Sequence, residues 1–281
     1  MDREVTGVIP CYNSASTLKE TINSLKSQTL LLSEIIVVDD GSTDNSAEIA
    51  VEMGCTVISN TISLGRGYAR MIGVKSAQTH FVLFCDSSNI VPSNFAEIAI
   101  KHFEEDLVCA CFGRILNYQG LTDDLSNWRA RHLFGVNKPY NKKIHQVNCL
   151  ITYAVMLRRE HVLSVGNFNP SLKQCEDQEL GEKLIAQNLK IISDPNLITY
   201  SIRKETFKSL SLRYARWNSD YAQPKFVLLD FLDALKVCIL IFSKEDLKDK
   251  QYKCLTISLL MPFLRLYYEF VKEMKLLQAF R

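Results

Sequence analysis

The 281-residue sequence contains no run of about 20 uninterrupted apolar residues, so no segment is predicted to cross a membrane as a helix. Its formal net charge is only +2, which argues against a protein that binds nucleic acid through bulk charge. Residues 1–4 are mostly charged and the first apolar run is short, unlike a secretory signal peptide. These absences favour a cytoplasmic protein that does not have nucleic acid as its partner.

The cysteine and histidine spacings typical of disulfide frameworks and zinc sites are also missing. The nine cysteines are odd in number and include no C-x-x-C pair, and several, such as Cys85 and Cys109, lie inside apolar runs. Such cysteines are typical of buried free thiols in a reducing compartment. The five histidines are scattered without the spacing of zinc ligands. We therefore expect neither a disulfide framework nor a structural zinc site.

What the sequence does contain is the alternation of strands and helices that is typical of an α/β protein. Apolar residues make up 47% of the chain, enough for a full core. Short Val- and Ile-rich or continuous apolar segments predict strands buried on both faces, in a parallel sheet covered by helices. Strands are expected at 4–9, 34–38, 56–59 and 80–85, with helices around 18–25, 43–53 and 67–77 between them.

Polar and acidic residues directly follow three of these strands. They are Pro10-Cys11-Tyr12-Asn13, then Asp39-Asp40-Gly41-Ser42, then Asp86-Ser87-Ser88-Asn89. In open α/β sheets, ligands bind beyond the carboxyl ends of the strands. This convergence is the main indication of a functional site that comes from the residues alone.

Beyond residue 106 the pattern is less regular. Strands are expected at 107–117 and 148–158, and helices at 124–134 and from Glu176 to Gln187. From Thr206 onward the chain is mostly helical, with two strongly apolar segments, 225–241 and 254–271. These helices are expected either to pack on the globular domain or on a second copy in a homodimer, or to lie on a membrane surface as a peripheral contact.

Five segments resemble the family 2 glycosyltransferases in order and spacing. They read VIPCYNSASTLKETINSLKSQT, EIIVVDDGSTDNS, GRGYARMIGVKSA, FVLFCDSSNIVP and GNFNPSLKQCEDQELGEKLIAQNLKI. The resemblance covers roughly residues 4–220. A dinucleotide-binding Rossmann protein would instead place G-x-G-x-x-G after the first strand.

The resemblance implies a GT-A fold, which is a doubly wound, mostly parallel sheet flanked by helices, with a helical C-terminal extension. It implies a glycosyltransferase domain at 1–220, divided into a nucleotide-binding half at 1–105 and an acceptor half at 106–220. The extension then covers 221–281. The implied activity is transfer of a sugar from a UDP- or GDP-type nucleotide sugar to a hydroxyl of a glycan or lipid-linked acceptor. Inversion at the anomeric carbon and a role in surface polysaccharide or lipid-linked glycan synthesis are part of this expectation.

The same resemblance assigns the nucleotide-sugar site. It places Asp40 in contact with the nucleotide base. Alternatively, Asp39 and Asp40 could serve only the turn in which they lie. Arg66 and Arg70 flank a glycine-bearing helix start, where arginine suits a phosphate, or both could be surface residues. The full set of residues expected to bind the nucleotide sugar is Pro10, Tyr12, Asn13, Asp40, Arg66, Arg70, Asp86 and Ser88.

The metal expectation concerns Asp86, which occupies the first position of the family's D-x-D motif. In relatives this motif helps to hold Mg²⁺ or Mn²⁺ on the diphosphate, where the cation neutralises charge on the leaving group. Here Ser88 replaces the second aspartate, and a hydroxyl is a poorer cation ligand than a carboxylate. The substitution also leaves open a protein that kept the fold and binds sugar nucleotides without catalysis.

The acceptor side is represented by two motifs. Asp177 matches the family's catalytic base, which removes the acceptor proton, and Glu176 precedes it; both could alternatively serve as helix-capping carboxylates. Arg216 and Trp217 match an acceptor-side motif of some members, and could equally belong to an amphipathic helix. A nucleotidyltransferase is less well supported, because the sequence after the first strand supplies no Gly-rich phosphate loop with a basic residue.

Overall fold

The computed structural model describes residues 3–172, 174–217 and 227–279, and these form two compact units. Unit 1 consists of residues up to Leu116 together with Tyr140–Arg203. Unit 2 consists of Asn117–Pro139 and the residues from Lys204 onward. Unit 2 is therefore assembled from an insertion between two strands of unit 1 and from the C-terminal helices.

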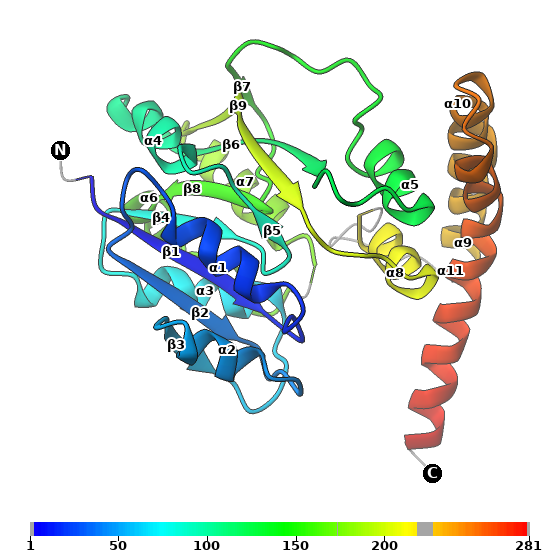
Figure 1. Cartoon of the computed structure of the whole chain (residues 1–281), viewed down its shortest axis with the longest axis horizontal. Coiled ribbons are helices and arrows are strands. Elements are labelled where there is room, and N and C mark those ends of the chain that lie inside the picture. Colours follow the sequence, from blue (N-terminus) through cyan, green and yellow to red (C-terminus); the bar gives the residue numbers. More distant parts are fainter. Residues whose placement is uncertain (1–2, 173, 218–226, 280–281) are drawn as a thin grey trace. The chain divides into compact units, whose positions relative to one another are not determined.

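In the described part of the chain, unit 1 is built on a nine-stranded sheet (Figure 1) with the order β3-β2-β1-β4-β8-β6-β9-β5 and with β7 paired to β9. The strands from the first half of the chain pair in parallel. They are β1 (Val5–Cys11), β2 (Glu34–Asp39), β3 (Thr56–Ser59) and β4 (Phe81–Cys85). The predicted sheet, flanked by helices on both faces, is confirmed.

The later strands extend this sheet in antiparallel pairs. Strand β8 pairs with β4 and β6, and β9 pairs with β5 and β7. The strand expected at 148–158 forms only in part, because residues 148–153 leave the sheet before β8 begins. The bounds are β5 (Asn89–Ile90), β6 (Val108–Asn117), β7 (His145–Val147), β8 (Ala154–Arg158) and β9 (Lys190–Ser201).

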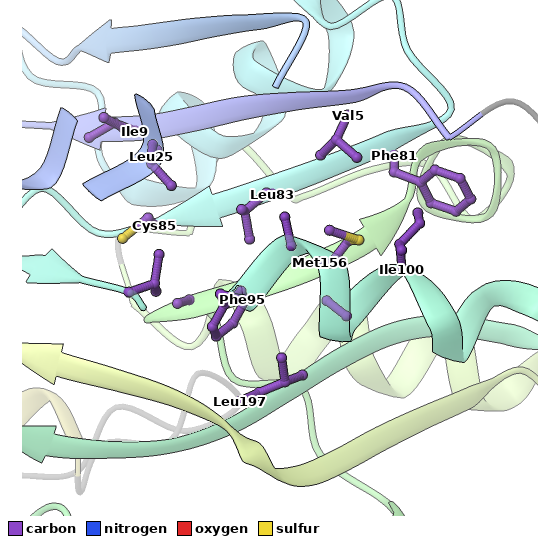
Figure 2. Close-up of a cluster of buried hydrophobic side chains, with 14 of the residues drawn as sticks. Val5, Ile9, Leu25, Phe81, Leu83, Cys85, Phe95, Ile100, Met156 and Leu197 are labelled. Atoms are coloured by element: carbon purple, nitrogen blue, oxygen red, sulfur yellow. The ribbon is translucent and has the colours of Figure 1, made fainter. Parts of the chain in front are cut away.

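Helices cover both faces of the sheet because side chains of one strand alternate between two cores. Val5 and Ile9 of β1 join one core, and Val8 joins the other. Figure 2 shows the first core, where side chains of β1, β4 and β8 point towards those of α1 and α4. This face carries α1 (Leu18–Lys26), α2 (Ser46–Glu52) and α4 (Phe95–Ile100), which leads into the 3-10 turn η1 (Lys101–Glu104). The other face carries α3 (Arg66–Ser76), α6 (Arg159–Ser164) and α7 (Glu176–Ala186).

Unit 2 is helical and has its own core. Trp128 is fully buried and packs with Leu210, Tyr214 and Met261. This packing explains why residues 117–139 belong with the C-terminal helices, whereas the sequence indicated a division at residue 220. The helices are α5 (Asp124–His132), α8 (Phe207–Trp217), α9 (Val227–Leu235), the π-helical turn η2 (Lys236–Phe242), α10 (Ser243–Lys248) and α11 (Tyr252–Ala279). Among the described residues, none of the helices combines the length and apolar character needed to cross a membrane.

Candidate functional site

The carboxyl ends of β1, β2 and β4 lie along one edge of the sheet, because these strands are parallel neighbours. Cys11 at the end of β1 is in register with Asp39 at the end of β2. Pro10 is in register with Val38, and Tyr12 follows directly with a side chain that is 52% exposed. The edge predicted from the sequence is thus formed, and it presents an aromatic side chain to solvent.

Asn13 ties the loop after β1 to the turn after β2. Its backbone adopts a left-handed conformation with φ of 49°, which Asn tolerates better than most residues. The Asn13 N–H donates to Ser42 Oγ at 2.9 Å, and Asn13 Oδ1 accepts from the Thr43 N–H at 2.8 Å. The Asn13 side chain therefore fixes the relative position of the two loops.

Asp40 has all of its acceptor positions occupied by the segment after β3. Oδ1 accepts from Asn60 Nδ2 at 2.9 Å and from the Leu64 N–H at 2.8 Å. Oδ2 accepts from Ser63 Oγ at 2.7 Å and from the Gly65 N–H at 2.8 Å. A carboxylate offers about four acceptor sites, so a nucleotide base at Asp40 would have to replace one of these donors. The structure shows Asp40 holding the 60–65 loop, which the sequence did not indicate.

The start of α3 is packed closely against the loop that precedes α7. Gly65 has a φ of +103°, which favours glycine. A Cβ at Gly67 would lie 2.2 Å from the Asn169 carbonyl oxygen. Only glycine fits at position 67 without displacing backbone. Arg66 is exposed and makes no hydrogen bond or ion pair with another described residue. Its guanidinium therefore stands free beside a helix N-terminus, an arrangement that suits a phosphate.

Arg70, which the sequence assigns to the nucleotide sugar, lies in a buried network of ion pairs. It is 2% exposed and joins two carboxylates from distant parts of the chain. Nη1 donates to Glu176 Oε1, and Nη2 donates to Asp86 Oδ1 at 2.7 Å. Burial alone would lower the pKa of Arg70, but the charges of Asp86, Glu176 and Asp177 raise it above its ordinary value. Arg70 thus connects the end of β4 to the first turn of α7.

Asp86 retains one oxygen that could bind a cation. Its side chain is 34% exposed, Oδ1 accepts from Arg70, and Oδ2 accepts no hydrogen bond from the described residues. The following residues serve the loop: Ser87 Oγ lies 2.7 Å from Ser14 Oγ, and the Ser88 carbonyl accepts from the Ile202 N–H at 3.0 Å. The described residues form no group of three or more His, Cys, Asp or Glu side chains suited to a metal.

One carboxylate oxygen nevertheless fits Mg²⁺ or Mn²⁺ that takes its other ligands from a diphosphate and water. Magnesium in particular is commonly held by one or two carboxylates together with substrate phosphates. The residues therefore fit a cation that arrives with the nucleotide, with Asp86 as the protein ligand. They do not form a preassembled cation cage.

Glu176 and Asp177 are adjacent in sequence but differ in surroundings. Glu176 is 3% exposed and is engaged by Arg70, whereas Asp177 remains partly exposed. The Asp177 carboxylate accepts from the Gln178 N–H at 3.0 Å and from Thr152 Oγ1 at 3.3 Å. The preceding Cys175 is left-handed, with φ of 58°, a conformation that is uncommon for residues other than glycine. Of the two acids, Asp177 is the one that a substrate hydroxyl could approach.

Thr152 is a site residue that the sequence did not indicate. It is 2% exposed and lies in the irregular segment before β8, which the sequence predicted as strand. Its hydroxyl donates to Asp177, which lies 25 positions away, and no local sequence pattern predicts such a contact.

The two remaining acceptor-side residues belong to unit 2. Trp217 ends α8 with a 43% exposed ring whose centroid lies 5.7 Å from that of Phe134. Arg216 precedes it on the same helix, and its side chain lies outside the described part of the structure. Their acceptor-side role stays a prediction.

Comparison with protein-family models shows that the chain matches the model described as glycosyl transferase family 2 over residues 6–164. Among curated proteins, the chain is 24% identical over 239 residues to the poly-beta-1,6-N-acetyl-D-glucosamine synthase of Staphylococcus aureus strain COL. That alignment covers 83% of this chain and 57% of the relative's length. The chain thus corresponds to little more than half of the curated relatives that it matches.

Solved structures share the fold at low sequence identity. The mannosyltransferase PcManGT of Pyrobaculum calidifontis, in complex with GDP-Man and Mn²⁺, superposes with a TM-score of 0.62 at 15% identity. The match covers 95% of this chain and 87% of that one. S. aureus TarS 1–349 in complex with UDP-GlcNAc gives a TM-score of 0.59 at 17% identity, covering 95% and 91% of the two chains. The GT-A fold expected from the sequence is confirmed by these neighbours.

Proposed function

Because the chain belongs to glycosyl transferase family 2, we propose that it transfers a sugar from a nucleotide diphosphate sugar to an acceptor hydroxyl. The observation that carries the proposal is the meeting of Asp86 and Glu176 on Arg70, beside Asp177. This arrangement brings the strand end that would face the diphosphate next to the acid that would face the acceptor. A site for group transfer requires both at one place.

The donor is a UDP- or GDP-sugar held over the carboxyl ends of β1, β2 and β4. Related structures contain UDP-GlcNAc and GDP-Man, which supports this class of donor. Tyr12 offers an exposed ring to the base, and Asn13 and Asp40 act by fixing the loops around it. The other residues assigned to the donor are Pro10, Arg66, Asp86 and Ser88, with Arg70 positioning Asp86.

In the transfer step, Asp177 accepts the proton of the acceptor hydroxyl while the hydroxyl oxygen attacks the anomeric carbon of the donor. The bond from that carbon to the diphosphate oxygen breaks, and the bonding electrons leave with the diphosphate. Attack from the face opposite the leaving group inverts the anomeric configuration. Thr152 and the Gln178 N–H, which both donate to Asp177, orient the carboxylate for this role.

Departure of the diphosphate requires compensation of its growing negative charge. The free guanidinium of Arg66 and the N-terminus of α3 supply positive charge from the protein. A Mg²⁺ or Mn²⁺ ion bound through Asp86 would neutralise further charge on the diphosphate oxygens. A neighbour solved with GDP-Man and Mn²⁺ supports a divalent cation here.

The acceptor is a glycan or a lipid-linked sugar, and the product is part of a surface polysaccharide or lipid-linked glycan. The similarity to poly-beta-1,6-N-acetyl-D-glucosamine synthase supports this product class. Arg216 and Trp217 are assigned to the acceptor side. We place the reaction in the cytoplasm at the inner face of a membrane.

A second candidate is a protein that binds nucleotide sugars without transferring them. The observation in its favour is Ser88, which stands where the family motif has a second acid, together with the absence of a preassembled cation cage among the described residues. Both candidates bind a nucleotide sugar, but only the first transfers the sugar.

A panel of UDP- and GDP-sugars separates these candidates. We expect at least one to raise the melting temperature, and the same sugar to be hydrolysed or transferred with release of UDP or GDP. Stabilisation without any release, across lipid-linked and oligosaccharide acceptors, would favour the binding protein. If no nucleotide sugar stabilises the chain, with or without Mg²⁺ or Mn²⁺, both candidates are wrong.

A further inference from the structure

Helix α11 exposes an apolar side as well as burying one. Cys254, Ile257, Met261 and Arg265 lie on its buried side, in or beside the core of unit 2. The opposite side carries apolar and aromatic side chains that are each at least 38% exposed: Leu259, Leu260, Phe263, Leu266, Tyr267 and Phe270. Contiguous exposed apolar side chains normally mark a surface that contacts a protein partner or a membrane. The exposed side of α11 therefore calls for a covering surface.

The continuous helix formed by α9, η2 and α10 runs antiparallel beside α11, as Figure 1 shows for these elements of unit 2. It buries Ala234, Cys238 and Phe242 in the same core as α11. Its outward side exposes Leu232, Leu240 and Leu247, at 50%, 53% and 58%. The two helices touch through the rings of Phe231 and Phe263, whose centroids are 5.7 Å apart. We name the exposed apolar residues of the two helices the outer helical face. They are Leu232, Leu240, Leu247, Leu259, Leu260, Phe263, Leu266, Tyr267 and Phe270.

Lysines are interspersed with the leucines of this face. Lys236, Lys244 and Lys248 are exposed, and none has an acidic partner among the described side chains. Three exposed lysines on four-carbon stems beside exposed leucines resemble the polar–apolar boundary of helices that lie on lipid.

The acids of the same helix are engaged elsewhere in unit 2. Asp249 pairs with Arg131 at 2.8 Å, and Glu245 lies 3.9 Å from Lys138. Asp246 is fully buried and accepts from His132 and Ser258. The exposed Asp233 also has a partner within the chain. Among the described side chains, the outer helical face is therefore apolar with an excess of positive charge.

We propose that the outer helical face binds an anionic lipid surface, with its leucines and aromatic rings in the headgroup–acyl boundary and its three lysines at the headgroups. Tyrosine and phenylalanine suit this boundary, and anionic headgroups complement the lysines. A second copy of the chain is a poorer occupant, because a two-fold contact presents the same lysines from both copies. This proposal adds a lipid-binding surface to the membrane location proposed above. Lipid binding does not require sugar transfer, so either proposal can fail without the other.

Co-sedimentation of the full chain with vesicles tests this proposal. We expect binding to vesicles of phosphatidylglycerol mixed with phosphatidylcholine, and much weaker binding to phosphatidylcholine alone. A lysine close to an anionic lipid surface strengthens binding by about fivefold, so replacing Lys236, Lys244 and Lys248 together by Gln lowers it about 100-fold. Replacing the exposed Lys19, Lys75 and Lys142 of unit 1 by Gln is the matched control, and it leaves binding within a few-fold.

A second variant tests the apolar contribution. Leu240→Ser combined with Leu259→Ser is expected to weaken vesicle binding at least tenfold, whereas Leu31→Ser on unit 1, where Leu31 is 77% exposed, leaves it unchanged. Tryptophan fluorescence verifies that each variant retains a folded unit 2, since both tryptophans lie there. Equal binding to both vesicle types, or no binding, would overturn the proposal. So would a concentration-dependent dimer that these same variants dissociate.

Discussion

Arg70 offers the sharpest test of how the two halves of the site are joined. Replacing it by Met leaves Glu176 as a carboxylate that is 3% exposed and has lost its guanidinium partner. Breaking a buried ion pair from one side costs about 3–5 kcal/mol. Asp86 is 34% exposed and can be hydrated instead, so its lost contact contributes at most about 1 kcal/mol. The expected cost of Arg70→Met is therefore about 3–5 kcal/mol in the free energy of unfolding of unit 1.

The double variant Arg70→Met with Glu176→Leu removes both charges of that pair. Replacement of a buried pair by apolar side chains is often neutral, so we expect the double variant to lie within about 1 kcal/mol of the parent protein. Glu176→Leu alone is expected to cost less than Arg70→Met, because Asp86 still pairs with Arg70.

Urea unfolding followed by two signals makes the measurement specific to unit 1. Both tryptophans, Trp128 and Trp217, lie in unit 2, so their fluorescence reports that unit. Far-UV circular dichroism reports the sheet of unit 1 as well. The expected loss appears in the dichroism transition, and a fluorescence transition that stays in place assigns the loss to unit 1. A cost below about 1 kcal/mol for Arg70→Met, or a double variant as unstable as the single one, would refute the assigned ion pair.

Three further outcomes follow from the structure. Mg²⁺ or Mn²⁺ alone should leave the melting temperature unchanged but raise it when UDP or GDP is present, and Asp86→Asn should remove that increment, because Asp86 supplies one ligand and the diphosphate the rest. Gly67→Ala should destabilise unit 1 by about 1–3 kcal/mol in urea unfolding, since its Cβ would lie 2.2 Å from the Asn169 carbonyl oxygen. Burial alone would raise the pKa of Glu205. The charge of Arg213 more than offsets this effect, with help from Ser209 and Arg129, so the pKa lies below its ordinary value. The stability this gives unit 2 is complete above about pH 5 and is lost as pH falls below about 4.3, as tryptophan fluorescence would record.

Each of these outcomes has a clear contrary result. A thermal shift by the cation alone would mean that a cation cage exists without the nucleotide. A Cβ at Gly120 would have its nearest atom 4.0 Å away. If Gly120→Ala lost as much stability as Gly67→Ala, the close contact at Gly67 would not be the cause of the loss. A Glu205→Gln variant with the same acid dependence as the parent would assign that dependence to other groups.

The sequence predicted the first half of the fold well because its signals are local. Continuous apolar segments bounded by polar turns identified β4, and the strand at Thr56–Ser59 was placed to the residue. The helix expected around 18–25 forms as α1, and Leu18, Ile22 and Leu25, which recur at helical spacing, are all buried. Parallel pairing then followed from the alternation of strands and helices, and with it the edge on which the polar residues gather.

The partners of the site residues were beyond the reach of sequence patterns. Arg70 contacts Glu176 across 106 positions, and an arginine beside a glycine-rich helix start looks the same whether it meets a phosphate or a carboxylate. The four donors around Asp40 come from the 60–65 loop, in which Gly65 adopts a φ of +103°. Residues 117–139 join unit 2 because Trp128 is buried there, whereas the sequence predicted a helix at 124–134 without its packing partners.

We propose that Asp177 takes the acceptor proton, and the substitution Asp177→Asn tests this role. Asp177→Asn keeps the size of the side chain and its position on α7, so the affinity for the nucleotide sugar should stay within a few-fold of the parent value. The turnover of sugar transfer should fall by about 10²–10⁴-fold, the contribution typical of a general base. Turnover that is unchanged in Asp177→Asn, measured with the donor that the panel identifies, would rule out Asp177 as the base.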